Sequence, residues 1–267
     1  MDVNFETIQT DKVSMGFLRF GTGDKTFVIL PGLSVGSLAP FAEAIAKQYD
    51  VFSHDYTVYL FDQPSNPPKP YSIKSYAQDI ANAMVALGLS NADVFGASRG
   101  GMLGLQLAVD HPELVHKLAL GSTPPHMDEC CSEALSRWIE CAEKHDGVGL
   151  YLDFCSMIYP ESFFEENIEA FRTAGSLASD ENLDHFVIFA QASTDFNIFE
   201  NLDAISCPIL QIASRDDKLV SLDTFIEFKR ALESKPGCES YLYDSYGHAS
   251  FDMAPDYPER LFRFFQK

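Results

Sequence analysis

Ser98 stands in the segment GASRGG, residues 96–101, between a short apolar run and a pattern of helical spacing. The run Ala92–Phe95 is typical of a buried strand, and the pattern after Ser98 predicts a helix. A chain that turns at once from strand to helix crowds its backbone, and small flanking residues relieve those contacts. The Ser98 side chain would then project beside the amino end of the helix, where N–H groups can stabilise developing negative charge. A serine in that position can serve as a nucleophile.

Short apolar runs alternate with helical patterns along most of the chain, which predicts βαβ units and a mostly parallel sheet. Residues 3–9 and 13–20 alternate apolar and polar residues, as an antiparallel edge hairpin does. The sequence therefore predicts an α/β fold with a mostly parallel eight-stranded sheet flanked by helices. The six further strands are expected at Thr26–Leu30, Thr57–Phe61, Ala92–Phe95, Lys117–Leu120, Ile209–Ala213 and Ser240–Tyr243. The helices are expected at Leu38–Gln48, Ile73–Leu87, Gly101–Val109, Leu222–Leu232 and Tyr257–Phe265.

The interval from about Thr123 to Cys207 breaks this alternation, because it contains only helical patterns rich in Phe, Met and Tyr. An all-helical insertion between two strands is expected to cover the carboxyl edge of the sheet as a cap. The predicted division is a core of residues 1–122 and 207–267 and a cap of residues 123–206. The cap side chains expected to close an apolar pocket over Ser98 are Leu135, Trp138, Ile139, Phe154, Met157 and Phe163.

The 267 residues include 19 basic and 39 acidic side chains, which gives a net charge of −20. This excess of negative charge disfavours nucleic acids and anionic membrane surfaces as partners. No apolar run is long enough to span a membrane, and the first residues show no secretory signal pattern. We therefore expect a cytoplasmic protein whose six cysteines are reduced thiols.

Five residues of the insertion could suggest a metal site, since Cys141 and His145 are spaced four apart on a predicted helix. No paired Cys-x-x-Cys spacing accompanies them, so we interpret them as structural residues of the cap. We expect neither a metal nor an organic cofactor. The five residues are His126, Cys130, Cys131, Cys141 and His145.

The spacing Gly96-x-Ser98-x-Gly100 resembles the nucleophile elbow of the α/β-hydrolase family. The resemblance extends over nearly the whole chain, because LPGLSVG, GASRGG, PILQIASRDDKLV and YGHASFD occur in the order that the family requires. It implies Ser98 as the nucleophile of a Ser-Asp-His triad in that chain order. Only His248 lies just after the final predicted strand, so the resemblance implies that His248 is the general base.

The resemblance also implies an orienting acid in the pair Asp216-Asp217. When the segment that begins at Pro208 is aligned without gaps to the pattern common in relatives, the position of the acid falls on Asp217. Asp216 remains the alternative. An oxyanion hole made by the backbone N–H groups of Leu33 and Arg99 is implied too. Many relatives have His-Gly where this chain has Pro31 and Gly32, a departure that leaves a backbone donor in place.

The resemblance therefore predicts a serine hydrolase that cleaves a small ester through an acyl-enzyme on Ser98, most simply a carboxylesterase. The same triad serves carbon–carbon bond hydrolases, perhydrolases and proline-type aminopeptidases. The last would need acidic cap residues for the substrate amine, for which Glu165, Glu166 and Glu169 are candidates. A ligand-binding member of the fold without turnover is the alternative from another class.

Overall fold

One eight-stranded sheet organises the chain, in the order β1-β2-β4-β3-β5-β6-β7-β8. The computed structural model describes residues 3–267, so residues 1–2 of the predicted core lie outside the described residues. β1 pairs with β2 and β2 with β4 in antiparallel fashion, and every other neighbouring pair is parallel. The predicted α/β fold is confirmed. The strands are β1 (Asn4–Gln9), β2 (Ser14–Phe20), β3 (Lys25–Leu30), β4 (Tyr56–Pro64), β5 (Ala92–Ala97), β6 (Val115–Gly121), β7 (Ile209–Ser214) and β8 (Glu239–Tyr243).

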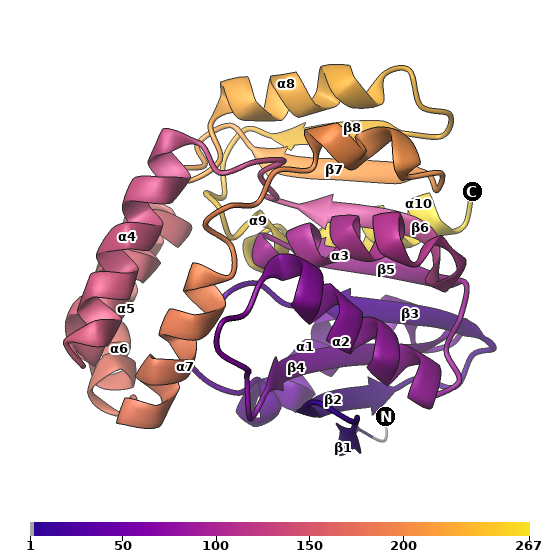
Figure 1. Ribbon diagram of the computed structural model, residues 1–267. Coiled ribbons are helices and arrows are strands. Elements are labelled where there is room, and N and C mark those ends of the chain that lie inside the picture. Colours follow the sequence, from indigo (N-terminus) through magenta and orange to yellow (C-terminus); the bar gives the residue numbers. More distant parts are fainter. Residues whose placement is uncertain (1–2) are drawn as a thin grey trace.

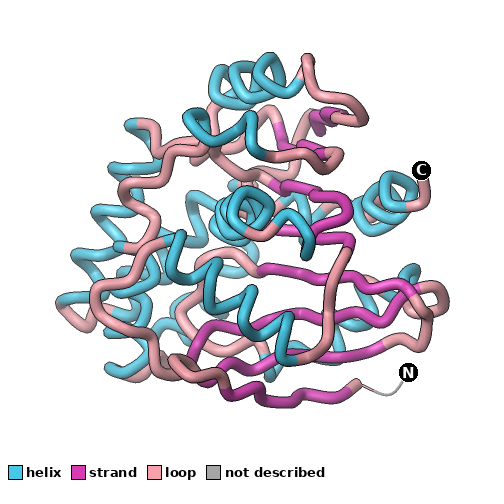
Figure 2. The backbone as a smooth tube through the Cα atoms, turned by 45° about the vertical axis from the view of Figure 1, so that its right-hand side comes forward, coloured by secondary structure: helices cyan, strands magenta, loops and turns pink. Residues whose placement is uncertain are grey.

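Helices cover both faces of this sheet (Figures 1 and 2). One face packs against α2, α3 and α8, and the other against α1 and α10. Each of the five predicted core helices is present, although the first begins later than expected because a short 3-10 turn precedes it. The helices are α1 (Ala42–Gln48), α2 (Ile73–Ala86), α3 (Arg99–Asp110), α8 (Leu222–Leu232), α9 (Ser250–Met253) and α10 (Tyr257–Phe265).

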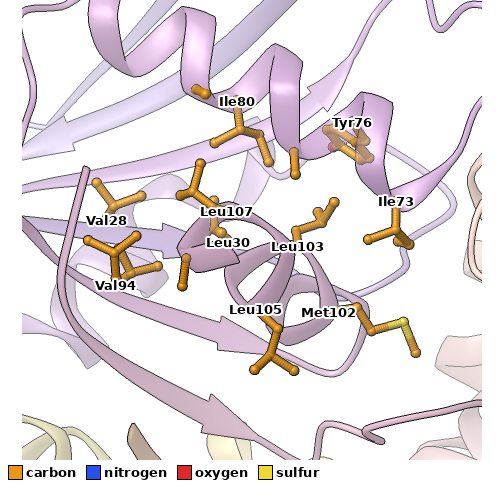
Figure 3. Close-up of a cluster of buried hydrophobic side chains, with 14 of the residues drawn as sticks. Val28, Leu30, Ile73, Tyr76, Ile80, Val94, Met102, Leu103, Leu105 and Leu107 are labelled. Carbon is orange, nitrogen blue, oxygen red and sulfur yellow. The ribbon is translucent and has the colours of Figure 1, made fainter. Parts of the chain in front are cut away.

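Successive residues of the parallel strands enter opposite halves of the core, as the strand period of two requires. Val28 and Val94 join the cluster under α2 and α3, whereas their neighbours Phe27 and Phe95 join the cluster under α1 and α10. Figure 3 shows the first cluster, in which side chains of the two helices meet those of β3 and β5. Because both faces are buried, the sheet holds the carboxyl ends of its strands in fixed positions.

Four helices connect β6 to β7 and lie together at one end of the sheet (Figure 1). They are α4 (Glu129–Glu143), α5 (Gly147–Ile158), α6 (Glu161–Ser176) and α7 (Asp180–Gln191). A third buried cluster joins them to the core, since Leu135 and Phe186 share it with Val35, Leu219 and Val220. Within residues 3–267, no helix combines the length and apolar character needed to cross a membrane.

Candidate active site

Ser98 occupies the turn between β5 and α3, as its spacing predicts. Its backbone has φ +51° and ψ −118°, a conformation that costs free energy in a residue with a side chain. The flanking glycines are required by close backbone contacts: a Cβ atom on Gly96 would collide with Gly100, and one on Gly100 would collide with Leu30. The Ser98 N–H donates to the carbonyl oxygen of Gly121 at 2.7 Å. The strained turn is therefore held by its neighbours on both sides.

His248 and Asp217 form a buried pair at the carboxyl edge of the sheet. The imidazole Nδ1 lies 2.9 Å from Oδ2 and 3.1 Å from Oδ1 of the carboxylate. Oδ1 also accepts the backbone N–H groups of Leu219 and Val220, at 2.8 and 3.0 Å. Because a carboxylate only accepts hydrogen bonds, Nδ1 carries a proton, and in the neutral imidazole Nε2 is then the nitrogen with the lone pair.

The free nitrogen of His248 has no competing partner. Nε2 is buried and makes no hydrogen bond to any side chain or backbone group in residues 3–267. His248 and Ser98 line the same pocket. The imidazole is therefore oriented on one side and open on the other, as a proton acceptor for a neighbouring hydroxyl must be.

Asp216 has a different set of partners. One carboxylate oxygen accepts the N–H of Gly247 at 2.9 Å and the Ser214 hydroxyl at 2.6 Å, and the other accepts the N–H of Tyr246 at 3.4 Å. These bonds hold the backbone of the turn that leads into His248. Of the two candidate aspartates, Asp217 contacts the imidazole, and Asp216 binds the backbone of the loop that contains His248.

The two predicted oxyanion donors, Leu33 and Arg99, line the pocket together with Ser98. Arg99 is the first residue of α3, so its N–H has no carbonyl partner within the helix. Within residues 3–267, neither the Leu33 nor the Arg99 backbone N–H donates a hydrogen bond. Neither N–H group is therefore engaged by another group of the described chain.

The Arg99 side chain contacts the loop that contains Leu33. Its Nη2 donates to the carbonyl oxygen of Gly32 at 3.1 Å and to Oε1 of Gln63 at 2.9 Å. The guanidinium is 2% exposed and lies over the rings of Tyr76 and Phe189, 5.4 and 5.1 Å from their centroids. Burial lowers the pKa of Arg99 below its ordinary value.

Two residues at the end of β4 hold the remainder of this loop. Gln63 Nε2 donates to the carbonyl oxygen of Ser34 at 3.1 Å. Asp62 Oδ2 accepts the Ser37 hydroxyl at 2.5 Å and the Leu38 N–H at 3.0 Å. No local sequence pattern indicates these contacts, since the partners are 24 to 29 positions apart.

The pocket encloses about 80 Å³ and is lined mostly by apolar side chains. Of the residues predicted to close it, Leu135, Trp138 and Phe154 line it, whereas Ile139, Met157 and Phe163 do not. The prediction for those three is wrong because their side chains pack elsewhere. Ile139 and Met157 pack on the buried cluster of the α4–α7 segment, and the Phe163 ring packs on Tyr159 at 4.9 Å. The lining residues are Gly32, Leu33, Ser98, Arg99, Met102, Pro124, Met127, Cys131, Leu135, Trp138, Phe154, Ile158, Ser193, Leu219, Val220, His248 and Phe251.

Two further polar groups belong to residues that line the pocket. The indole N–H of Trp138 and the hydroxyl of Ser193 are buried, and neither has a hydrogen-bond partner within residues 3–267. Trp138 is 5% exposed and Ser193 is 4% exposed. A buried polar group without a partner is costly, so a polar atom of a bound molecule would gain from meeting it.

The residues weighed as a metal site do not converge. The Cys130 and Cys131 thiols donate to the carbonyl oxygens of Lys218 and Leu219, at 2.9 and 3.1 Å. His126 contacts a carboxylate of α8, and His145 contacts two carboxylates of α7. In the described part of the chain, no three His, Cys, Asp or Glu side chains are grouped so that they could hold a metal ion.

Comparison with known proteins places this fold in a family. Residues 25–138 match the model of the alpha/beta hydrolase fold. The chain is 30% identical over 239 residues to a protein of Stutzerimonas stutzeri named "Putative carbamate hydrolase RutD", covering 84% of this chain and 85% of that one. It is 28% identical over 261 residues to a 2-hydroxy-6-oxononadienedioate/2-hydroxy-6-oxononatrienedioate hydrolase of a Pseudomonas species, covering 91% and 89%.

Solved structures show the same fold at lower sequence identity. An alpha/beta hydrolase enzyme from a Medee basin deep-sea metagenome library superposes with a TM-score of 0.86 at 20% identity, covering 98% of both chains. The enol-lactonase from Burkholderia xenovorans superposes with a TM-score of 0.82 at 17% identity, covering 98% of this chain and all of that one. The chain belongs to the α/β-hydrolase fold family, which places it among the hydrolases of that fold.

Proposed function

We propose that this protein is a serine hydrolase that cleaves a small ester through an acyl-enzyme on Ser98. The observation that supports this most directly is the buried contact between His248 and Asp217, on a pocket that Ser98 also lines. His248 is the general base, Asp217 orients it, and the N–H groups of Leu33 and Arg99 form the oxyanion hole. No step requires a metal or an organic cofactor.

In the first half of the reaction, Ser98 Oγ attacks the acyl carbon while His248 Nε2 takes the hydroxyl proton. The carbonyl oxygen becomes an anion that the two N–H groups stabilise. The bond to the alcohol then breaks, the imidazolium gives its proton to the departing oxygen, and the acyl group stays on Ser98. In the second half, His248 takes a proton from water as the water attacks, and the acid leaves with Ser98 restored.

We further propose that residues 123–206 act as the cap and select an uncharged substrate. Among the lining residues of the described chain, Arg99 is the one with a permanently charged side chain, and its guanidinium is bonded to Gly32 and Gln63. An apolar pocket with few polar groups favours a small neutral acyl compound. The unpartnered Trp138 N–H and Ser193 hydroxyl favour a compound with a hydrogen-bond acceptor or hydroxyl away from the scissile bond.

The proposed partner is accordingly a small molecule and neither a nucleic acid nor a membrane, in keeping with the net charge of −20. We propose a cytoplasmic location, which suits six cysteines that are all free thiols. The aminopeptidase alternative is disfavoured, because Glu165, Glu166 and Glu169 are exposed on α6 and do not line the pocket.

Hydrolysis of a carbamate or of a carbon–carbon bond is the second candidate. The names of the two relatives favour it, and the same Ser98, His248 and Asp217 would be needed. An ester and a carbamate ester both release an alcohol but leave different groups on the serine, an acyl and a carbamoyl group, whereas cleavage of a carbon–carbon bond releases a carbanion that must be protonated. A panel of p-nitrophenyl esters, carbamates and vinylogous diketones of matched size therefore separates the candidates.

The decisive test begins with covalent labelling by a fluorophosphonate, which reacts only with an activated serine. Wild-type protein is expected to label and the Ser98→Ala variant is not. Turnover of p-nitrophenyl esters of graded acyl length then measures the preferred substrate. Absence of labelling in folded wild-type protein would favour a binding protein without turnover.

A further inference from the structure

We propose that the Arg99 side chain is a positioning residue that sets the direction of the oxyanion donor of Leu33. This inference rests on the proposed function, since it assigns a role within that oxyanion hole. Arg99 would then act on both halves of the hole. Its own backbone N–H is one donor, and its guanidinium holds the peptide group that provides the other.

The peptide group between Gly32 and Leu33 joins the two halves of this arrangement. A trans peptide is planar, and its C=O and N–H bonds point in opposite directions. Nη2 of Arg99 donates to the Gly32 carbonyl oxygen at 3.1 Å. A fixed carbonyl therefore fixes the opposite direction of the N–H of Leu33, a residue that lines the pocket together with Ser98.

The charge of Arg99 also strengthens this donor. A cation at the carbonyl oxygen draws electron density from the peptide and makes its N–H a better hydrogen-bond donor. The same Nη2 donates to Gln63 Oε1 at 2.9 Å, and Gln63 Nε2 donates to Ser34 in the same loop. The loop is thus held at Gly32 and at Ser34, the residues on either side of Leu33.

A packing role alone does not explain a cation at this place. Within residues 3–267 no carboxylate forms an ion pair in direct contact with Arg99; the Asp62 charge acts on it from farther away, and Nε and Nη1 have no hydrogen-bond partner. A buried charge without a contacting opposite charge is costly, and an apolar side chain of similar length would fill the space at lower cost. The rings of Tyr76 and Phe189 offset part of the cost by lying against the guanidinium.

The test compares Arg99→Met with wild type on p-nitrophenyl acetate. Loss of a whole oxyanion donor lowers kcat by about 100-fold to 1,000-fold. Misdirection of one donor is expected to lower kcat by about 10-fold to 100-fold with KM nearly unchanged, because the contact matters mainly in the transition state. Arg260→Met is the matched control, since Arg260 also lies over two aromatic rings, Tyr241 and Tyr243, and does not line the pocket.

The inhibition constant of a trifluoromethyl ketone is a measurement that a purely structural role of Arg99 would leave unchanged. The ketone forms a tetrahedral oxyanion adduct with the serine, so its inhibition constant is expected to rise in Arg99→Met by the same factor by which kcat/KM falls. Gln63→Leu, which keeps the cation, is expected to show a smaller parallel change. Gln63→Leu also serves as the test should Arg99→Met fail to fold.

Two results would overturn the inference. Unchanged kcat and inhibitor affinity in folded Arg99→Met would exclude a positioning role. A loss confined to esters that carry a carboxylate, such as a hemisuccinate, would show that the guanidinium binds substrate instead. Failure of wild-type protein to react with a fluorophosphonate would contradict the proposed function itself, which keeps the two failures distinct.

Discussion

Asp217 contacts the imidazole of His248 at 2.9 Å, while the adjacent Asp216 contacts only the backbone and a serine hydroxyl around the same loop. Neighbouring residues at the end of a strand point in different directions, so one can orient the base and the other can brace its turn. The side chains of both Asp217 and His248 are buried. In such a site the carboxylate fixes the tautomer that leaves Nε2 unprotonated.

Asp217→Asn is expected to lower kcat by up to about 10⁴-fold, because an amide in this place stabilises the wrong tautomer of His248. Asp216→Asn is the matched control. It keeps an oxygen that can accept the Gly247 N–H, so its kcat is expected to stay within about tenfold of wild type. Turnover of p-nitrophenyl acetate and thermal unfolding of both variants provide the measurement. A larger loss in Asp216→Asn would assign the orienting role to Asp216.

The sequence predicted the sheet and its helices because alternation of buried runs with helical patterns is a local property. It also predicted the turn at Ser98, since Gly96 and Gly100 are demanded by contacts that the turn itself creates. The contacts of the Arg99 guanidinium lie 67 and 36 positions away along the chain. Such partners are chosen by the tertiary fold, and no local pattern indicates them.

The lining of the pocket was predicted only in part for the same reason. Helical periodicity shows which residues share a face, and it placed Trp138 and Ile139 together. It does not show which part of that face meets a cavity and which part meets another helix. Trp138 lines the pocket, whereas the next residue, Ile139, does not.

Removal of the Ser98 hydroxyl is expected to abolish turnover and preserve the fold. Ser98→Ala should lower the rate by about 10⁴-fold or more. Ser98→Gly should be equally inactive but at least as stable as Ser98→Ala. Relief of the strained φ of +51° is worth about 1–3 kcal/mol, against about 0.5–1 kcal/mol for the added freedom of glycine in the unfolded chain. Urea unfolding of the two variants measures the difference, and a clearly less stable Ser98→Gly would argue against strain at the elbow.

The Cys131 thiol is expected to stabilise the loop that contains Asp217. It donates to the Leu219 carbonyl oxygen at 3.1 Å, and the Leu219 N–H donates to Asp217. Burial raises the pKa of Cys131, so the thiol stays protonated and can donate at neutral pH. Cys131→Ala should lower the free energy of unfolding by about 1–2 kcal/mol, whereas Cys131→Ser keeps a donor and should lose less. Equal stability of the two variants would contradict this role.

Short and medium acyl esters are expected to be hydrolysed better than long-chain lipids. A cavity of about 80 Å³ that is lined mostly by apolar side chains suits a short acyl group. The measurement is kcat/KM for p-nitrophenyl esters from acetate to palmitate, together with an emulsified triglyceride. A preference for the triglyceride would require α4 and α5 to move away from Ser98.

The last prediction concerns the Trp138 N–H and the Ser193 hydroxyl. If they bind an acceptor in the acyl group, an ester with an ether oxygen should be preferred to the same ester with a methylene there. p-Nitrophenyl methoxyacetate and butyrate form such a pair, since they differ only in that one atom. The ether also activates the scissile carbonyl, so the measured quantity is the change in the ratio of their kcat/KM values from wild type to variant.

Trp138→Phe removes the N–H and keeps an aromatic ring against Phe154, and Ser193→Ala removes the hydroxyl. Each is expected to lower the methoxyacetate-to-butyrate ratio by about 5-fold to 10-fold, as loss of a neutral hydrogen bond of about 1–1.5 kcal/mol does. Phe154→Leu is the control, because it alters the shape of the same pocket without removing a polar atom. An unchanged ratio in both polar variants, or an equal change in Phe154→Leu, would mean that shape alone selects the acyl group.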